Sequence, residues 1–334
     1  MKTKDLLNIA QKCKKVTAKN NIPILDNILF KNRSAYAANL NSGVYLEYKI
    51  SIEGEFLFDC NMLVKILSKL KKESEITFSQ DENKVFLHVD GVRKFNVEKR
   101  EVDDFPLFPD LKNTNTWDYS EKDHTNLLKA FKYVNNDDLR PVLNAVYVGK
   151  HIVATDAHNL CFFKPVCAVQ EPFLIDSGII PYFDKKQPYT CLYDSKHIKF
   201  VFPDYSVIVR NVEGEYPSYE AVIPVDQPGK VTLPKNELIE NLNLAEIAAN
   251  QGSKQGVFDL NGKVTLTSQD LDFKYGFEYV FDSKANLECR IGFKIPFLQQ
   301  IISDIDSDHV VIKYTDPSRA FVVNDEFLLM PMKM

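Results

Sequence analysis

The hydrophobic and polar positions at the start of the chain follow a helical pattern. Apolar side chains recur every three or four positions, and lysine and amide side chains fill most positions between them. With about 3.6 residues per turn, this spacing gathers the apolar residues on one face. We predict three such helices in the first two thirds of the chain. Their apolar faces are Leu6, Ile9, Ala10, Cys13 and Val16 in the first, Met62, Leu63, Ile66, Leu67 and Leu70 in the second, and Leu127, Leu128, Phe131 and Val134 in the third.

Runs of strand length alternate with these helices. PILDNILF begins at Pro23 and PVLNAVYV begins at Pro141, and each is mostly apolar and follows an Asn/Asp-rich loop. Both contain β-branched residues, so we predict a strand in each. GVFDLNGKVTLTSQD from Gly256 parallels NAVYVGKHIVATDAH from Asn144. Each of these segments predicts a hairpin that ends in a Thr/Ser–x–Asp turn.

One short sequence motif, which we call the repeated phrase, occurs twice. DDFPLFPDL around Pro106 and GEYPSYEAVIP around Pro217 each place an acidic residue before an aromatic–Pro pair, and a second aromatic follows. The two prolines lie 111 positions apart, about a third of the chain. A short helix followed by a strand also recurs from Cys60, Ile179 and Lys294, and two prolines shorten the middle copy. We predict an α+β chain of three similar domains, residues 1–117, 118–225 and 226–334, each with two helices and antiparallel sheets. The repeated phrase then closes the first two domains.

The amino-acid composition argues against several classes of protein but does not identify the function. A chain of 334 residues is too long for one ordinary core, and 45% hydrophobic with 26% charged residues is typical of globular proteins. There are only 12 glycines and no GxGxxG or GxxxxGK[ST], which argues against a dinucleotide-binding or P-loop enzyme. No segment resembles a signal peptide, and no apolar run approaches the ~20 residues of a membrane span. The six cysteines lie among apolar residues without metal-binding spacing, so we expect buried free thiols in a reducing cytoplasm.

The charges are distributed unevenly. The chain has 46 acidic and 41 basic side chains, yet the polar faces of the first three helices carry lysines and hardly any carboxylates. A solvated surface explains any one such face. Three together favour contact with nucleic-acid phosphates of any sequence, for which the lysine charge is suited. The candidate contacts are Lys4, Lys12, Lys15, Lys19, Lys65, Lys69, Lys72, Lys122, Lys129, Lys132 and Arg140. The last third presents Glu237, Glu240, Asp304 and Asp306 instead, so we expect it to contribute little.

A catalytic centre is not indicated. Asp156 and His158, two apart in ATDAHNL, would share a face on a strand and could bind a metal. Without a third ligand at readable spacing, a turn capped by Asp156 is the favoured interpretation. No nucleophile–His–acid set can be recognised from spacing. We expect no catalytic residue, metal or cofactor, and a metal-dependent hydrolase remains an alternative hypothesis.

Four motifs carry a family resemblance. LRPVLNAVYV, IVATDAHNL, GEYPSYEAVIP and the end FLLMPMKM closely resemble the bacterial sliding clamp, the β subunit of DNA polymerase III, in order and spacing over the whole chain. NIPILDNILF is similar to the first domain of the same family. The resemblance implies a divergent member, of bacterial or phage origin, with the DNA clamp fold. Each subunit would form half of a homodimeric ring around duplex DNA, with helices lining the hole. A monomeric processivity factor with the same domains is the alternative.

The resemblance also implies a groove for short peptides of the replicative polymerase, the clamp loader and other DNA enzymes. Its positions fall on Thr155, His158, Leu160, Pro217, Val222, Phe297, Leu329, Met330, Pro331 and Met332. A floor of Met, Leu, Val and Phe suits an adaptable peptide-binding surface. The other interpretation is that the MPM segment simply ends a core strand. Asn159, Glu220 and Ala221 stand where many clamps have basic residues.

Overall fold

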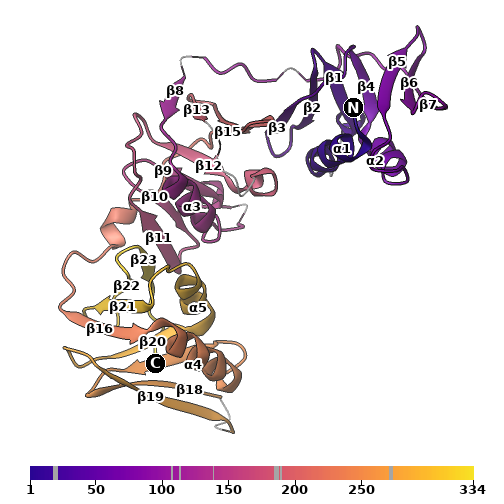
Figure 1. Cartoon of the computed structure of the whole chain (residues 1–334). Helices are drawn as coiled ribbons and strands as arrows, with labels where there is room; N and C mark the ends of the chain where they lie inside the picture. The colour runs from indigo at the N-terminus through magenta and orange to yellow at the C-terminus, as the bar shows by residue number, and fades with distance from the viewer. Residues whose placement is uncertain are drawn as a thin grey trace. The chain divides into compact units, whose positions relative to one another are not determined.

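The structure is a computed structural model and describes residues 1–17, 22–106, 108–112, 114–137, 139–183, 188, 190–270 and 274–334. The chain divides into two compact units, which we describe separately (Figure 1). The first unit comprises residues 1–125, 148–150 and 165–213. The second comprises residues 126–147, 151–164 and 214–334. Helix α3 (Glu121–Ala130) and strand β9 (Ala145–Val148) have residues in both.

The first unit is built on one large antiparallel sheet. Its strands follow the order β4-β1-β2-β3-β15-β14-β13-β8, and a small sheet has the order β5-β6-β7. The helices are α1 (Thr3–Thr17), α2 (Cys60–Leu67) and the 3₁₀ turns η1 (Pro23–Asp26) and η3 (Ser177–Tyr182). The strands are β1 (Asn27–Lys31), β2 (Ser34–Asn39), β3 (Val44–Lys49), β4 (Phe56–Asp59), β5 (Ile76–Gln80), β6 (Lys84–Val89), β7 (Arg93–Glu98), β8 (Asn115–Trp117), β12 (Phe173–Asp176), β13 (Thr190–Tyr193), β14 (His197–Val201) and β15 (Tyr205–Arg210).

The second unit repeats this plan. It contains the strand order β9-β10-β11-β23-β22-β21-β16 and a smaller sheet, β19-β18-β17-β20. Its helices are α4 (Lys235–Ala248), α5 (Ile295–Ser303) and the 3₁₀ turns η2 (Pro141–Asn144) and η4 (Tyr219–Val222). Its remaining strands are β10 (Ile152–Thr155), β11 (Asn159–Phe163), β16 (Gly229–Pro234), β17 (Gln255–Asp259), β18 (Lys263–Gln269), β19 (Gly276–Lys284), β20 (Arg290–Lys294), β21 (His309–Tyr314), β22 (Phe321–Val323) and β23 (Phe327–Leu329).

Strand pairing joins segments that lie far apart in the sequence. In the first unit, β15 pairs with β3 through Tyr205 opposite Tyr48 and the residues that follow. In the second, β11 pairs with β23, with Leu160 opposite Leu328. The α+β class with antiparallel sheets is therefore confirmed. The division into three domains near residues 117 and 225 stays a prediction. Each large sheet contains strands from two of the three predicted domains, so the sheets do not separate them.

The predicted apolar face of the first helix is confirmed. Its five apolar residues are at most 8% exposed, and α1 lies beside α2 (Figure 1). The α2 helix begins at the Asp59 cap, whose carboxylate accepts from the Met62 N–H at 2.6 Å, and it ends at Leu67. Lys69, Leu70 and Lys72 thus lie beyond the helix that we predicted to contain them. Met62 is 46% exposed rather than buried.

The third helix differs more from its prediction. It ends at Ala130, so Phe131, Lys132 and Val134 follow it. Its buried face includes three polar residues, Asp123, His124 and Asn126. Asp123 is buried because it caps the helix start: its carboxylate accepts from the Ser120 hydroxyl at 2.6 Å and from the Val166 N–H at 2.8 Å.

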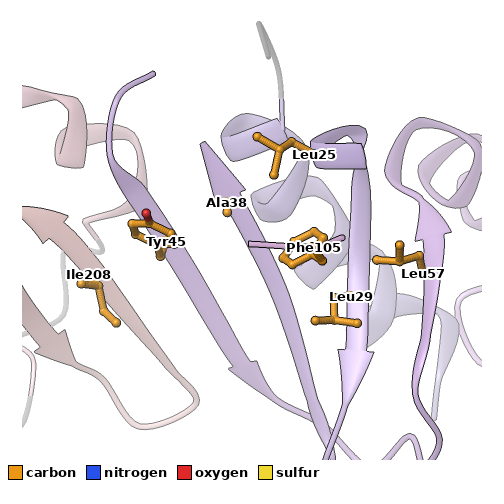
Figure 2. Packing of buried hydrophobic residues seen from close by; sticks show 7 residues of the cluster. All are labelled: Leu25, Leu29, Ala38, Tyr45, Leu57, Phe105 and Ile208. Carbon is orange, nitrogen blue, oxygen red and sulfur yellow. The ribbon is translucent and has the colours of Figure 1, made fainter. Parts of the chain in front are cut away.

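The repeated phrase anchors aromatic side chains on the sheets. Phe105 is buried against Leu29, Ala38 and Leu57 of the first unit, where Figure 2 shows its ring lying over the strands. In the second unit, Tyr219 is buried in a cluster with Leu160 and Leu328. Each copy therefore fastens an extended connection to the sheet beside it by aromatic burial.

Two strand predictions were wrong at their starts. Pro23–Asp26 and Pro141–Asn144 form 3₁₀ turns, and the strands begin only at Asn27 and Ala145. Proline has no N–H for a strand ladder, and its φ near −65° suits the first position of a helical turn. The two hairpins that we predicted are present as β9–β10 and β17–β18. No helix in the described part of the chain is long and apolar enough to cross a membrane.

Candidate functional site

The lysines of the first helix point away from its buried face. Lys15 is exposed, and the Lys4 ammonium lies 3.3 Å from the Glu73 carboxylate in an exposed pair. The Lys12 ammonium lies 4.9 Å from the centre of the Tyr205 ring, so the ring holds it close to the protein surface. Lys19 lies outside the described residues.

The second helix and the segment after it present the clearest basic surface. Lys65, Lys69 and Lys72 are all exposed, and among the described residues none of them has a carboxylate within 4 Å. Lys122 on α3 and Arg140 before η2 are exposed as well. In the described structure, no ion pair has to break before these side chains bind a polyanion.

Two other candidate lysines are held in ion pairs with the end of α5. The Lys132 ammonium contacts the Asp304 carboxylate, and the Tyr133 hydroxyl donates to the same carboxylate at 3.1 Å. The Lys129 ammonium lies 2.9 Å from Asp306 and is only 12% exposed. We call these five residues the α3–α5 latch. Sequence reasoning missed it because it treated both aspartates as part of a surface that contributes little to DNA binding.

The latch keeps a carboxylate inside the protein. The Asp304 side chain is 2% exposed, so its charge depends on Lys132 and on Tyr133. Burial and the neighbouring Asp304 raise the pKa of Tyr133, which keeps its hydroxyl protonated as a donor. The Tyr133 ring lies 5.7 Å from the Phe327 ring of β23. The latch therefore supports the strand that leads into the chain end.

The turn between β10 and β11 carries two of the groove candidates, Thr155 and His158. The Thr155 hydroxyl donates to the Asn159 carbonyl at 2.7 Å, and Asp156 Oδ1 accepts from the His158 and Asn159 N–H groups at 2.8 Å. Ala157 has a φ of 75°, in the left-handed region that favours glycine. The predicted turn with an aspartate cap is confirmed, and His158 is left exposed at its tip.

The chain end lies against this turn. The Met330 N–H donates to the His158 carbonyl at 2.9 Å, and the Met332 N–H donates to the Gly292 carbonyl at 2.8 Å. A Cβ on Gly292 would lie 2.7 Å from the Met332 carbonyl oxygen, so only glycine permits this approach. The Phe297 ring stacks on the His158 ring at 5.7 Å. Residues from three distant segments thus meet at one surface.

An aromatic floor lies beside this surface. Leu160 belongs to a buried cluster with Val153, Tyr219 and Leu328, on which Tyr147, Phe162, Tyr216 and Ile223 pack. Pro217 precedes η4 and Val222 is its last residue, and both are exposed. Met330 is 42% exposed. Leu329 is fully buried, and Pro331 and Met332 are partly exposed. Tyr216 and Tyr219 belong to the repeated phrase, but the sequence did not predict that they lie under the candidate groove.

The alternative metal site gains no support from this geometry. Asp156 is engaged in capping the turn, two residues before His158. Within the residues that the structure describes, no group of three or more His, Cys, Asp or Glu side chains could hold a metal ion. All six cysteines are free, and five are buried as predicted, whereas Cys167 is partly exposed. Burial raises the pKa of Cys60 to about 11, which leaves its thiol protonated.

The latch predicts an ordered set of stabilities. Lys132→Ala should lower the free energy of unfolding by about 1–3 kcal/mol, because the buried Asp304 carboxylate loses its cation. Adding Asp304→Asn should recover part of this loss, since a neutral amide needs no cation. Urea and thermal melts followed by circular dichroism measure both variants, with Lys65→Ala as an unpaired control. A double variant no more stable than Lys132→Ala would contradict the latch.

Comparisons with known proteins agree with this arrangement. Residues 1–109 match the DNA polymerase III beta subunit N-terminal domain, and residues 220–327 match its C-terminal domain. The beta sliding clamp of Treponema pallidum is 23% identical, with 95% of this chain and 94% of that protein covered. That of Caulobacter vibrioides is 22% identical, with 96% and 95% covered.

Solved structures show the same fold. The Pseudomonas aeruginosa DNA polymerase sliding clamp, solved with a ligand, has a TM-score of 0.88 at 19% identity, and 100% of this chain and 99% of that chain are covered. The Bacillus subtilis clamp has a TM-score of 0.87 at 18% identity, with 100% and 98% covered. Together, the two matched domains span well over half of the chain. The chain belongs to the DNA polymerase III β subunit family, the bacterial sliding clamps.

Proposed function

We propose that the chain encircles duplex DNA as a homodimeric ring and tethers the replicative polymerase through the groove at its C-terminal end. Membership of the sliding-clamp family makes the chain a non-catalytic processivity factor of DNA replication. The observation that carries the proposal for this chain is the convergence of His158, Phe297 and Met330 at one partly apolar surface. The ring would work in the cytoplasm on nucleoid DNA, or in a host cytoplasm if the chain is phage-encoded.

Two edge strands support ring closure between subunits. In the first unit, β7 pairs only with β6 among the described strands, and in the second, β19 pairs only with β18. Phe95 on β7 is 38% exposed and Val280 on β19 is 47% exposed. Edge strands present unpaired N–H and C=O groups that a partner strand can take up. The strand β7 of one subunit would pair with β19 of the other. The closed dimer would contain two such interfaces.

The charges of these edges are complementary. Basic side chains dominate β7 and the residues after it, namely Arg93, Lys94, Lys99 and Arg100. The β19 edge carries Glu278 and Asp282. On neighbouring α4, Leu244 and Ile247 are 46% and 76% exposed and add apolar area. Opposite charge would set the pairing of unlike edges, and apolar contact would add affinity.

The ring predicts a dimer that one edge charge disrupts. Light scattering at micromolar concentration should give twice the 38.3 kDa chain mass. Val280→Lys should give monomers, because it would place a positive charge against the basic β7 edge in the new strand pair. Leu139→Lys, at a position that is 89% exposed and belongs to neither edge strand, should stay dimeric. A wild-type protein that is monomeric at tens of micromolar would defeat the ring and favour a monomeric processivity factor.

The DNA face is best tested at lysines outside the latch. Replacing Lys65, Lys69 and Lys72 by Ala should weaken retention on nicked circular DNA for every sequence alike. Each lost phosphate contact should lower the slope of log affinity against log salt by about 1, because fewer counterions are released. Glu240→Gln on α4 is the control and should leave retention unchanged. Normal retention by the triple variant would mean that these lysines are only a solvated surface.

The groove predicts loss of peptide binding when the chain end is removed. Deleting Met330–Met334 removes three exposed or partly exposed methionines, together with the hydrogen bonds that Met330 and Met332 donate to the His158 and Gly292 carbonyls. Binding of a labelled peptide with a glutamine and two hydrophobic anchors should disappear, while the dimer persists. Met330→Ala should weaken binding by about 1–3 kcal/mol, roughly five- to 150-fold.

A melt followed by circular dichroism must show that the truncated protein is folded. Leu160→Ala is a poor probe of the groove, because Leu160 is 3% exposed and its truncation should cost about 2–5 kcal/mol of stability. Native peptide affinity in the folded truncation would show that partners dock elsewhere.

A further inference from the structure

A lysine absent from the predicted groove residues lies at its wall. The Lys294 ammonium is 4.8 Å from the centre of the Phe297 ring, one helical turn further along the chain. The same ring stacks on His158 with 20° between the ring planes. Lys294 is the last residue of β20 and the residue that precedes α5, so its backbone is fixed on both sides. The cation is therefore held in place by a regular backbone and an aromatic face.

The chain end connects Lys294 to the rest of the groove. Met332 bonds to Gly292, two residues before Lys294 on the same strand. The Gln255 amide, on the residue opposite Lys294 in β17, donates to the Lys333 carbonyl at 2.9 Å. Lys294 thus borders the surface formed by Phe297 and the terminal methionines. A peptide seated on these side chains would pass near its ammonium.

The nearby carboxylates are engaged elsewhere. Among the described residues, no carboxylate lies within 4 Å of the Lys294 ammonium, whereas neighbouring Lys254 lies 3.3 Å from Glu246. Asp156 accepts the N–H groups of its own turn. Glu220 belongs to the η4 side of the groove, where it adds to the effect of burial in raising the pKa of Tyr147. Among the residues that the structure describes, the positive charge of Lys294 therefore has no carboxylate within 4 Å.

We propose that Lys294 is a specificity-determining residue of the groove and selects partner peptides that carry an acidic side chain beside their hydrophobic anchors. This inference rests on the proposed function, because it names the kind of peptide that the same groove takes. A peptide that covers the groove displaces water, so attraction between its carboxylate and the fixed ammonium is screened less than in bulk solvent. A lysine at the same peptide position would be repelled. The groove would therefore select peptides both by attracting an acidic side chain and by repelling a basic one.

Three synthetic peptides test the selection. Each is an acetylated, amidated pentapeptide that begins with glutamine and ends with leucine and phenylalanine, and its central residue is aspartate, asparagine or lysine. Competition against a fluorescent copy of the aspartate peptide, read by anisotropy on the full-length protein, gives the three affinities. The wild type should bind the aspartate peptide about five- to tenfold more tightly than the asparagine peptide, and the lysine peptide most weakly.

Charge variants give the decisive comparison. Lys294→Gln should bind the aspartate and asparagine peptides equally, and Lys294→Glu should prefer the lysine peptide. Lys230→Gln, which removes an equal charge from β16, should keep the wild-type order. A change of order with charge reversal cannot come from a general loss of folding, and unchanged melting temperatures confirm this.

The two proposals fail in different ways. If the wild type binds all three peptides with equal affinity, the selection by Lys294 is overturned and the groove stands. Unchanged discrimination in Lys294→Gln would also overturn it, because another group would then be responsible. If the wild type binds none of the peptides, the groove itself is overturned and the selection falls with it.

Discussion

Strands from distant parts of the chain must pair before either large sheet, the groove or the charged surfaces can form. An unpaired strand edge leaves N–H and C=O groups without partners, and a buried edge of this kind is costly. The chain meets the requirement twice, by pairing β15 with β3 and β23 with β11. Each pairing turns two short sheets into one large sheet. The connections can then remain extended, because aromatic side chains such as Phe105 fasten them to the sheet surface.

The candidate groove is a consequence of the second pairing. Since β23 lies beside β11, the chain emerges next to the β10–β11 turn, and Met330 bonds to His158. The absence of a side chain at Gly292 lets the following residues approach β20. Phe297 reaches the same surface from the start of α5. None of these segments could form a binding surface alone, so the stability of the sheet and the shape of the groove are coupled.

Tertiary contacts also decide which of the candidate lysines are paired and which are exposed. The exposed lysines of α2 and its following turn have no partner carboxylates among the described residues, whereas Lys129 and Lys132 are engaged by α5. Lysines that the sequence places on the polar faces of similar helices therefore fall into two physical classes. One class is available to phosphate, and the other joins α3 to α5 around a buried carboxylate. Lys294 illustrates a third situation, in which an aromatic ring rather than a carboxylate holds the cation.

Residue types and their spacing over a few positions were enough to predict the local features of this structure. The buried face of α1, the aspartate-capped turn at Asp156, the buried thiols and the repeated aromatic–Pro phrase all follow from residue type and period over a few positions. Proline chemistry ought to have signalled the 3₁₀ turns before β1 and β9, but the apolar run concealed them. The contact between Lys132 and Asp304, which lie 172 residues apart, could be found only from the folded chain. Periodicity reports which face of an element is buried, but it carries no information about which distant side chain lies opposite.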